Sequence, residues 1–439
     1  MPITDPESIV TEKDLAAFYQ GIRPYLTKGG KQPPPQPIVY GIHIIANESD
    51  PDSKVEYLED CVGFTPAHMD YTNDVFDYGS WENAFFMPKP CMLKYDGTVD
   101  YYLNPNDYTK KSDGTASDVA STSYGGNAMM EWPKIWLKIV PDTTKSNYEA
   151  NIYISDTKID EDYTDWPYHN SAGESMDHFY TPIYNGSLIS SKLRSISGQA
   201  VSNNKTAQQE WDYARANNPT GSLIWNIEVE ADVTLINILL MLISKSTDAQ
   251  AKFGMGLTES GSQAILNAFR TGVHNTKGLF YGTNSGTAST YTNVVKVFGM
   301  ENWWGYQFRR YLGHMLINGV QTVKKTYGQE DGTTVTDYNL TGNGYKTADS
   351  TSPSGSSSGA YLKFIKFTED GMYPEVTGGT SSTYYPDMIG FNNSGTCFPF
   401  RGGYCNDGVA NGPFFVYMGI GTSFSGWHVG SALSAKPLQ

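Results

Sequence analysis

One apolar run constrains the fold of this chain more than any other feature. Residues 233–243, VTLINILLMLI, form the longest hydrophobic stretch in the 439-residue sequence. Asp232 and Lys245 flank the run and Asn237 interrupts it. A membrane-spanning helix needs about 20 consecutive apolar residues, so this run is too short to cross a bilayer. We predict that it forms the main core helix, although a helix that fills a partner's groove would show the same pattern.

The rest of the chain is typical of short strands joined by loops. Only 18% of the residues are charged, and the chain contains 44 Gly and 31 Tyr. This composition favours an α+β fold with mixed short strands, two or three helices and long loops. Further helices are expected at 207–217 and 259–270, strands at 38–45, 131–140 and 147–155, a hairpin around Asp96-Gly97, and an exposed loop at 347–361.

The amino-terminal region has the pattern of an anchor followed by a spacer. Thr11 is a predicted helix N-cap, and apolar residues then recur at helical spacing up to Arg23-Pro24. Residues 29–37, GGKQPPPQP, form a predicted stiff spacer. A helix packed on its own domain would show the same periodicity. We therefore expect an anchor and spacer at 1–37, a β-rich intermediate region at 38–129 and a main domain at 130–439.

Charge and motifs disfavour several classes of function. A formal net charge of −15 disfavours nucleic-acid binding. The sequence has no phosphate-binding loop, no nucleophile elbow and no zinc-ligand spacing, so we expect neither catalysis nor a metal or other cofactor. The seven histidines occur singly and are expected to be structural. The acidic clusters Asp160/Glu161/Asp162 and Glu228/Glu230/Asp232 are interpreted as solvated charges, although paired carboxylates also serve glycosidases.

Cysteine content and the amino terminus bear on the cellular compartment. The four cysteines, Cys61, Cys91, Cys397 and Cys405, are expected to be buried free thiols rather than disulfides. Residues 1–18 lack the basic and apolar regions of a signal peptide. We therefore expect synthesis in a cytoplasm without export by the general secretory route.

The carboxy-terminal stretch 398–434 is the most distinctive part of the chain. Between Tyr404 and His428 there is no Lys, Glu, Gln or Arg, and Asp407 is the one charged side chain. Tyr, Phe, Asn, Ser, Thr and Gly fill the stretch instead. Antibody paratopes have this composition, because Tyr gives large contact area at low entropic cost and small polar residues adapt their hydrogen bonds. An ordinary irregular β segment would have a similar composition.

The order of the residues adds a resemblance to a known family. Arg401-Gly402-Gly403, then Phe414-Phe415, then residues 425–433 (SGWHVGSAL) resemble the variable region of diversity-generating-retroelement target proteins. These have a C-type-lectin fold, and phage tropism determinants are among them. Upstream, residues 299–305 (GMENWWG) resemble a segment shared by that lectin subgroup and by formylglycine-generating enzymes. Residues 239–257 resemble the family's central helix, so the resemblance covers roughly residues 130–434.

The resemblance implies a diversified binding surface on a fixed frame. Mutagenesis at template adenines changes Asn codons to a limited set that excludes Lys, Glu, Gln, Met and Trp, so Met418 and Trp427 are expected to be packing residues. The expected variable, ligand-binding residues are Tyr404, Asn406, Asp407, Asn411, Tyr417, Gly419, Ile420, Thr422, Phe424 and His428. The expected frame residues are Arg401, Gly402, Gly403, Gly408, Gly412, Trp427 and Gly430.

The function implied by the resemblance is host attachment by a phage. The chain would be a receptor-binding protein at a virion tail or fibre tip, made in the host cytoplasm and joined to other virion proteins through its amino terminus. Its partner would be a host-cell surface receptor, either protein or glycan, and a homotrimer is expected because multivalency raises avidity. A structural virion protein, such as a head fibre or decoration protein, and a host-encoded surface protein are the alternatives.

An enzyme is a further alternative that the cysteines argue against. Formylglycine-generating enzymes hold copper with two closely spaced carboxy-terminal cysteines. Here Cys405 follows the Arg-Gly-Gly motif with no cysteine after it, and Cys397 precedes the motif. The resemblance therefore implies a binding protein and not a copper-dependent oxidase.

Overall fold

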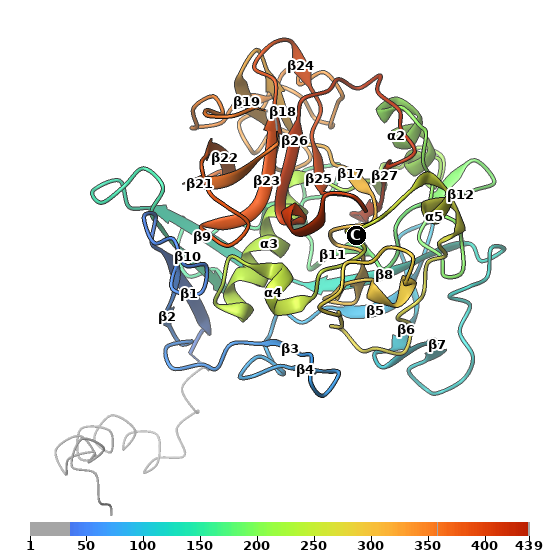
Figure 1. Ribbon diagram of the computed structural model, residues 1–439. Helices are drawn as coiled ribbons and strands as arrows, with labels where there is room; N and C mark the ends of the chain where they lie inside the picture. Colours follow the sequence, from blue (N-terminus) through green and yellow to red (C-terminus); the bar gives the residue numbers. More distant parts are fainter. Residues whose placement is uncertain (1–35, 358, 438–439) are drawn as a thin grey trace, which may run out of the picture. The chain divides into compact units, whose positions relative to one another are not determined.

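The apolar run forms the central helix α3 (Glu230–Ser244), and all 15 of its residues are buried. The computed structural model describes residues 36–357 and 359–437, and the described residues from Val39 onward group into one compact unit. Within this unit, α3 packs in one hydrophobic core with strands from both large sheets (Figure 1). No helix in the described part of the chain combines the length and apolarity needed to cross a membrane.

An antiparallel sheet of seven strands forms one side of this core. Its spatial order is β14-β28-β11-β8-β5-β6-β7. The strands are β5 (Lys89–Lys94), β6 (Val99–Asn104), β7 (Asp107–Lys111), β8 (Gly126–Pro133), β11 (His178–Pro182), β14 (Trp225–Ile227) and β28 (Leu433–Ala435).

A second sheet of seven strands is mixed, with the order β22-β21-β23-β26-β25-β17-β27. Its β23–β26 and β17–β27 pairs are parallel. The strands are β17 (Phe308–Arg310), β21 (Ala360–Thr368), β22 (Gly371–Thr377), β23 (Tyr385–Phe391), β25 (Phe400–Gly402), β26 (Gly412–Met418) and β27 (Val429–Ser431). Only Ala432 separates β27 from β28, so the end of the chain ties the two large sheets together.

Smaller elements surround these sheets. One four-stranded sheet has the order β2-β1-β10-β9 and another the order β20-β19-β18-β24. Their strands are β1 (Val39–Ile44), β2 (Val55–Glu59), β9 (Trp136–Pro141), β10 (Ala150–Ser155), β18 (His314–Ile317), β19 (Val320–Val323), β20 (Lys346–Thr347) and β24 (Thr396–Cys397). Two-stranded pairs are formed by β3 (His68–Asp70) with β4 (Val75–Asp77), β12 (Ser187–Ile189) with β13 (Lys192–Arg194), and β15 (Lys296–Val297) with β16 (Met300–Glu301). The remaining helices are α2 (Ala207–Arg215), α4 (Ala249–Phe253), α5 (Gln263–Ala268), η2 (Trp166–Tyr168), η3 (Tyr291–Asn293) and η4 (Gly408–Ala410).

The expected α+β class is confirmed, with strands in clear excess over helices. The predicted helix at 207–217 is α2, where Thr206 and Gln209 form a capping box. The predicted helix at 259–270 is shorter than expected, since α5 spans only Gln263–Ala268. The predicted hairpin is β5–β6, and Gly97 supplies the positive φ of +85° that its turn requires.

Of the predictions of domain organisation, one lies outside the described residues and another differs from the structure. The expected amino-terminal helix lies outside the described residues, as does the spacer apart from residues 36 and 37. The expected boundary between 129 and 130 falls inside β8, which pairs with β5 on one side and β11 on the other. The regions before and after this boundary therefore share one sheet.

Candidate binding face

Five of the residues predicted to bind ligand lie together on one surface of the second sheet. Tyr404, Tyr417, Ile420 and Phe424 are half-buried around a floor of buried apolar side chains. The His428 ring joins them, 4.9 Å from the Tyr404 ring and 6.0 Å from the Phe424 ring, measured between centroids. We call the aromatic face the set Met388, Tyr404, Tyr417, Ile420, Phe424 and His428, with its floor of Phe308, Phe400, Phe415 and Val429.

These rings lie close together because of how the strands of the second sheet pair. Phe400 on β25 is the register partner of Tyr417 on β26, and Phe415 lies two residues before Tyr417 on the same side of that strand. Phe308 on the neighbouring β17 completes the floor. Its ring centroid lies 4.9 Å from Tyr404 and 5.4 Å from Phe415, within the range of favourable aromatic pairs.

The loop after β26 carries the rest of the face and is tied down along its length. Its carbonyl groups accept hydrogen bonds from distant backbone amides: Phe398 to Ile420 at 2.8 Å and Phe308 to His428 at 3.0 Å. The start of α2 contributes a third, from Ala207 N–H to the Thr422 carbonyl at 3.0 Å. Figure 1 shows this loop reaching from β26 toward α2. The surface side chains thus project from a fixed backbone.

A buried arginine holds the middle of the same loop. Arg310 donates from Nη2 to the Phe424 carbonyl at 2.7 Å and forms an ion pair with Glu210 of α2. Both side chains are fully buried. Ser431 Oγ donates to the same Glu210 carboxylate at 2.6 Å. Because a buried charge is costly unless it is paired and hydrogen-bonded, this arrangement fixes the position of the loop.

A second buried ion-pair network lies at Arg401, an expected frame residue. Arg401 Nη2 donates to Glu228 Oε1 at 2.7 Å, and Nη1 donates to the Trp303 carbonyl at 2.9 Å. The guanidinium carbon lies 3.7 Å from the Trp303 ring centroid. Arg309 forms an ion pair with the same Glu228 oxygen at 3.2 Å. Arg401 therefore supports the sheet from within and is not part of the aromatic face.

The interpretation of Glu228, Glu230 and Asp232 as solvated charges is wrong. All three carboxylates are at most 4% exposed. Glu228 pairs with the two arginines, Glu230 with Lys325 at 3.2 Å, and Asp232 with Lys436 at 2.8 Å. Burial is possible because each carboxylate has a cation brought to it by another element. The other acidic cluster is exposed as expected, and there Asp160 and Asp162 both contact Lys138.

Asn411 is a second correction, because it cannot face a ligand. Its side chain is fully buried, and Nδ2 donates to the Gly408 carbonyl at 2.9 Å. A Cβ at Gly403 would come within 1.9 Å of Asn411 Oδ1, and Gly403 has a φ of +73°. Asn411 and Gly403 therefore belong to the frame beneath the face.

The other predicted ligand-binding residues lie near the surface but outside the aromatic cluster. Asn406 is exposed, while Gly419 and Thr422 are partly exposed. Asp407 is mostly enclosed, and burial raises the pKa of its carboxyl to about 7 although Tyr404 N–H donates to it at 3.2 Å. Trp427 packs against the cluster around Leu257, Phe269 and Tyr306, and Met418 is fully buried.

Five contributors to the aromatic face and its floor were not among the predicted residues: Met388, Phe308, Phe400, Phe415 and Val429. Alternation in FFVYM (414–418) places Phe415 on the same side of its strand as Tyr417, whereas Phe400 joins them only through the register of β25 with β26. Phe308 has no local signal, because its contact with Tyr404 spans almost a hundred positions of the chain. Met388 comes from β23 and likewise has no local signal.

The cysteines of this protein are thiols, and none of them belongs to a cluster of metal-ligating side chains among the described residues. All four cysteines are buried free thiols, as expected. Burial raises the pKa of the Cys405 thiol to about 12, which keeps it protonated at neutral pH. Within residues 36–357 and 359–437, no three His, Cys, Asp or Glu side chains are arranged to hold a metal ion. No protein-family model matches this sequence, and no curated protein matches it either.

Proposed function

We propose that this protein is the receptor-binding protein of a phage virion and that the aromatic face contacts a receptor on the host-cell surface. One observation carries the proposal. The family resemblance implies that Tyr404, Tyr417, Ile420, Phe424 and His428 are variable, and these five residues lie on one contiguous surface. The finer fold assignment, a C-type-lectin-like domain, is part of the same proposal.

The chemistry of the face suits recognition rather than catalysis. Its exposed groups are aromatic and aliphatic, and the nearby charged groups Arg310, Glu210, Arg401 and Glu228 are buried beneath it and paired with one another. Burial also lowers the pKa of His428, which favours the neutral form of this ring. Rigid rings on a fixed backbone lose little entropy on binding, which favours affinity through shape and hydrogen bonding.

The proposal extends to the assembly. The amino-terminal segment would attach the protein to other virion proteins, and a homotrimer would present three copies of the aromatic face. Linking several weak sites multiplies the apparent affinity for a cell surface that displays many receptors. The protein itself would need no catalytic group for this role.

Adhesion of purified protein to bacteria tests the proposal. Labelled protein is screened against a panel of bacterial strains, and the strain that it binds is used for Tyr404→Ala/Tyr417→Ala/Phe424→Ala. We expect this variant to keep its thermal stability within a few degrees and to lose adhesion by about two orders of magnitude, because a few central aromatic residues usually dominate an interface.

The matched control removes three apolar side chains that are more exposed and lie elsewhere: Val62→Ala/Val75→Ala/Leu188→Ala. This control should adhere as the wild type does. If the aromatic-face variant folds and still adheres normally, the proposed site is wrong. If both triple variants lose adhesion equally, the effect is not specific to the face and the proposal also fails.

A further inference from the structure

Residues 324–345 connect β19 to β20 without a helix or strand of their own. Irregular segments longer than about 12–15 residues are uncommon in compact domains, because their backbone groups lack the partners that helices and sheets supply. The first part of this segment, residues 324–328, is nevertheless buried. Its backbone carbonyl groups therefore need hydrogen-bond donors from other groups.

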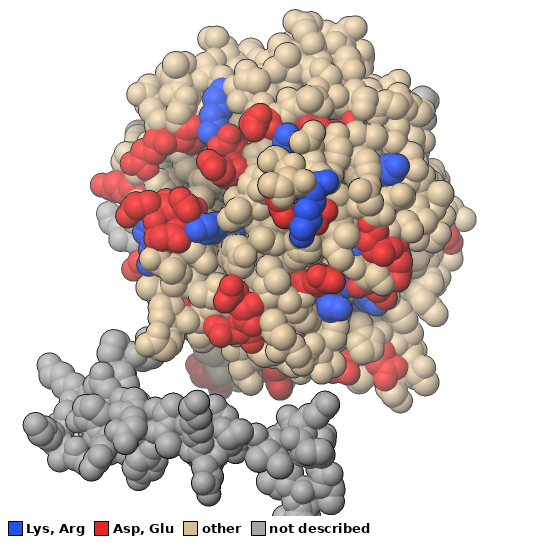
Figure 2. Space-filling model, turned by 90° about the vertical axis from the view of Figure 1, so that its left-hand side faces the viewer, with Lys and Arg blue, Asp and Glu red and all other residues tan. Residues whose placement is uncertain are grey.

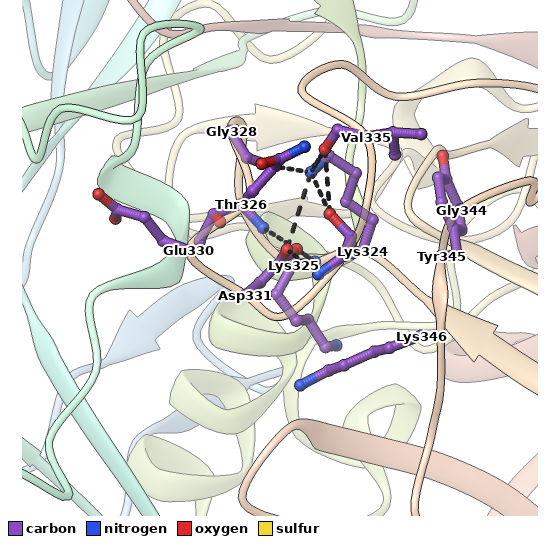
Figure 3. Close-up of polar contacts among 12 residues, drawn as sticks. Lys324, Lys325, Thr326, Gly328, Glu330, Asp331, Val335, Gly344, Tyr345 and Lys346 are labelled. Carbon is purple, nitrogen blue, oxygen red and sulfur yellow. Dashed lines mark hydrogen bonds and ion pairs between the residues drawn. The ribbon is translucent and has the colours of Figure 1, made fainter.

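The ammonium group of Lys324 supplies such donors from inside the loop. Its side chain is fully buried, and Nζ donates to the Val335 carbonyl at 3.0 Å, to Thr333 Oγ1 at 3.0 Å and to the Gly328 carbonyl. An ammonium group has three N–H donors and no acceptor, so these three contacts use all of its donors. Figure 3 shows the contacts meeting at the Lys324 nitrogen.

Asp331 adds a carboxylate oxygen to the shell and balances the ammonium charge. Its Oδ1 lies 3.8 Å from Lys324 Nζ, and its side chain is almost fully buried. The same carboxylate accepts the backbone N–H groups of Lys325 at 2.7 Å, Thr326 at 3.0 Å and Thr333 at 3.2 Å. The buried cation is thus surrounded by oxygen atoms of one loop, and its counter-ion holds the backbone of that loop.

The oxygen atoms around Lys324 are of the kinds that hold a metal ion in other loops. Ca²⁺ is bound by carbonyl and carboxylate oxygens at about 2.3–2.6 Å. The two distances of 3.0 Å at Lys324 are instead those of ordinary N–H···O hydrogen bonds. The surroundings also favour a cation, because six carboxylates and three lysines line the cleft beside the loop. Figure 2 shows that acidic side chains predominate on the side of the molecule that carries β9 and β10.

Lys54 shows a similar arrangement in the segment between β1 and β2. Its side chain is fully buried, and Nζ donates to three backbone carbonyl groups, those of Ile45 at 2.8 Å, Ala46 at 2.7 Å and Glu48 at 3.1 Å. Both lysines adjoin a strand, since Lys324 follows β19 and Lys54 precedes β2. The strand fixes the backbone of each lysine, so its ammonium group can order the irregular segment beside it.

We propose that the loop 324–335 is a cation cage in which the Lys324 ammonium group occupies the place of a bound metal ion. The cation belongs to the chain itself, so no ion has to be taken up from solution to order the loop. The loop would then keep its order in the presence of a chelator. It would also accept an alkylammonium ion from solution once the lysine side chain is removed. This inference goes beyond the function proposed for the aromatic face, with which the loop shares no residue.

Removal and replacement of the ammonium group test the inference in the full-length protein. Lys324→Ala deletes the side chain beyond Cβ, and propylammonium has the size and the three N–H donors of the deleted part. Hydrogen exchange of peptides covering residues 325–335 is followed by mass spectrometry. We expect exchange in this variant to be at least about tenfold faster than in the wild type, because the loop loses its central donor. Propylammonium chloride should restore most of the protection, since it binds the folded loop.

Three controls separate the cage from a general loss of stability. Tetramethylammonium has the same charge but no N–H donor, so it should restore no protection. Lys324→Met fills the cage without a donor, so its loop should exchange fast with or without propylammonium; this milder variant decides the test if Lys324→Ala does not fold. Residues 45–49, which contact Lys54, should exchange at the wild-type rate in both variants.

Three results would overturn the inference. The first is unchanged exchange of residues 325–335 in both variants, which would mean that the ammonium group does not order the loop. The second is equal protection of Lys324→Ala by propylammonium and tetramethylammonium. The third is faster exchange of this loop in the wild type when EDTA is added, because a metal ion and not Lys324 would then order it.

Discussion

Replacement of Glu228 by Gln tests the buried frame beneath the second sheet. Glu228 is 1% exposed, and one carboxylate oxygen faces two guanidinium groups, Arg401 at 2.7 Å and Arg309 at 3.2 Å. Gln has nearly the same shape but no charge. The substitution would therefore leave two buried cations without their shared anion while changing the packing very little.

The expected loss follows from the burial of all three groups. Removing one partner of a buried ion pair costs about 3–5 kcal/mol, because the remaining charge stays in a medium of low polarity. The carbonyl oxygen of the Gln side chain can still accept the hydrogen bond from Arg401, so we expect a loss at the lower end of this range, about 3 kcal/mol. Burial, together with the neighbouring Arg401, lowers the pKa of Arg309 to about 9 even with Glu228 present, so the site already disfavours positive charge.

Urea denaturation followed by the fluorescence of the nine tryptophans measures this loss. The control is Asp162→Asn, which removes an exposed carboxylate from an ion pair with Lys138 and should change stability by less than about 1 kcal/mol. A loss below about 1 kcal/mol for Glu228→Gln would mean that the carboxylate is solvated and that the buried network has been misassigned.

Two further predictions concern the variable positions. Asn411→Tyr should prevent folding or lower the free energy of unfolding by several kcal/mol, because residue 411 is fully buried. Asn406→Tyr, at an exposed position, should leave the melting temperature unchanged. If the protein tolerates both substitutions equally, the assignment of Asn411 to the buried frame is wrong. The pKa of the Asp407 carboxyl is about 7 in the folded protein, against an ordinary 3.8, so the folded state favours the protonated carboxyl. The stability that protonated Asp407 contributes to the folded state is therefore fully present below about pH 4 and is lost as the pH rises through 7. The stability of Asp407→Asn relative to the wild type should therefore increase between about pH 5 and pH 8 in urea titrations, and a difference independent of pH would contradict the raised pKa.

Predictions from local patterns succeeded where neighbours in the sequence supply the relevant contacts. The α3 helix follows from an apolar run with flanking charges, and the β5–β6 turn follows from Asp96-Gly97, whose glycine tolerates positive φ. A buried apolar run correctly indicated β1, and period-two alternation correctly indicated β10. The boundary at 129/130 had no such local basis, and β8 spans it because its strand partners come from both sides.

The sequence by itself determined the α+β class, the core helix, the buried thiols and the composition of 404–428, where Asp407 is the one charged side chain. Only the tertiary structure decided which of those residues share a surface, that Phe308 supplies its floor, and that Asn411 lies beneath it. It also decided that Glu228, Glu230 and Asp232 are buried. The physical reason is the same in each case: burial of a polar side chain depends on a partner, and the partner of Glu228 is Arg401, 173 positions away in the chain.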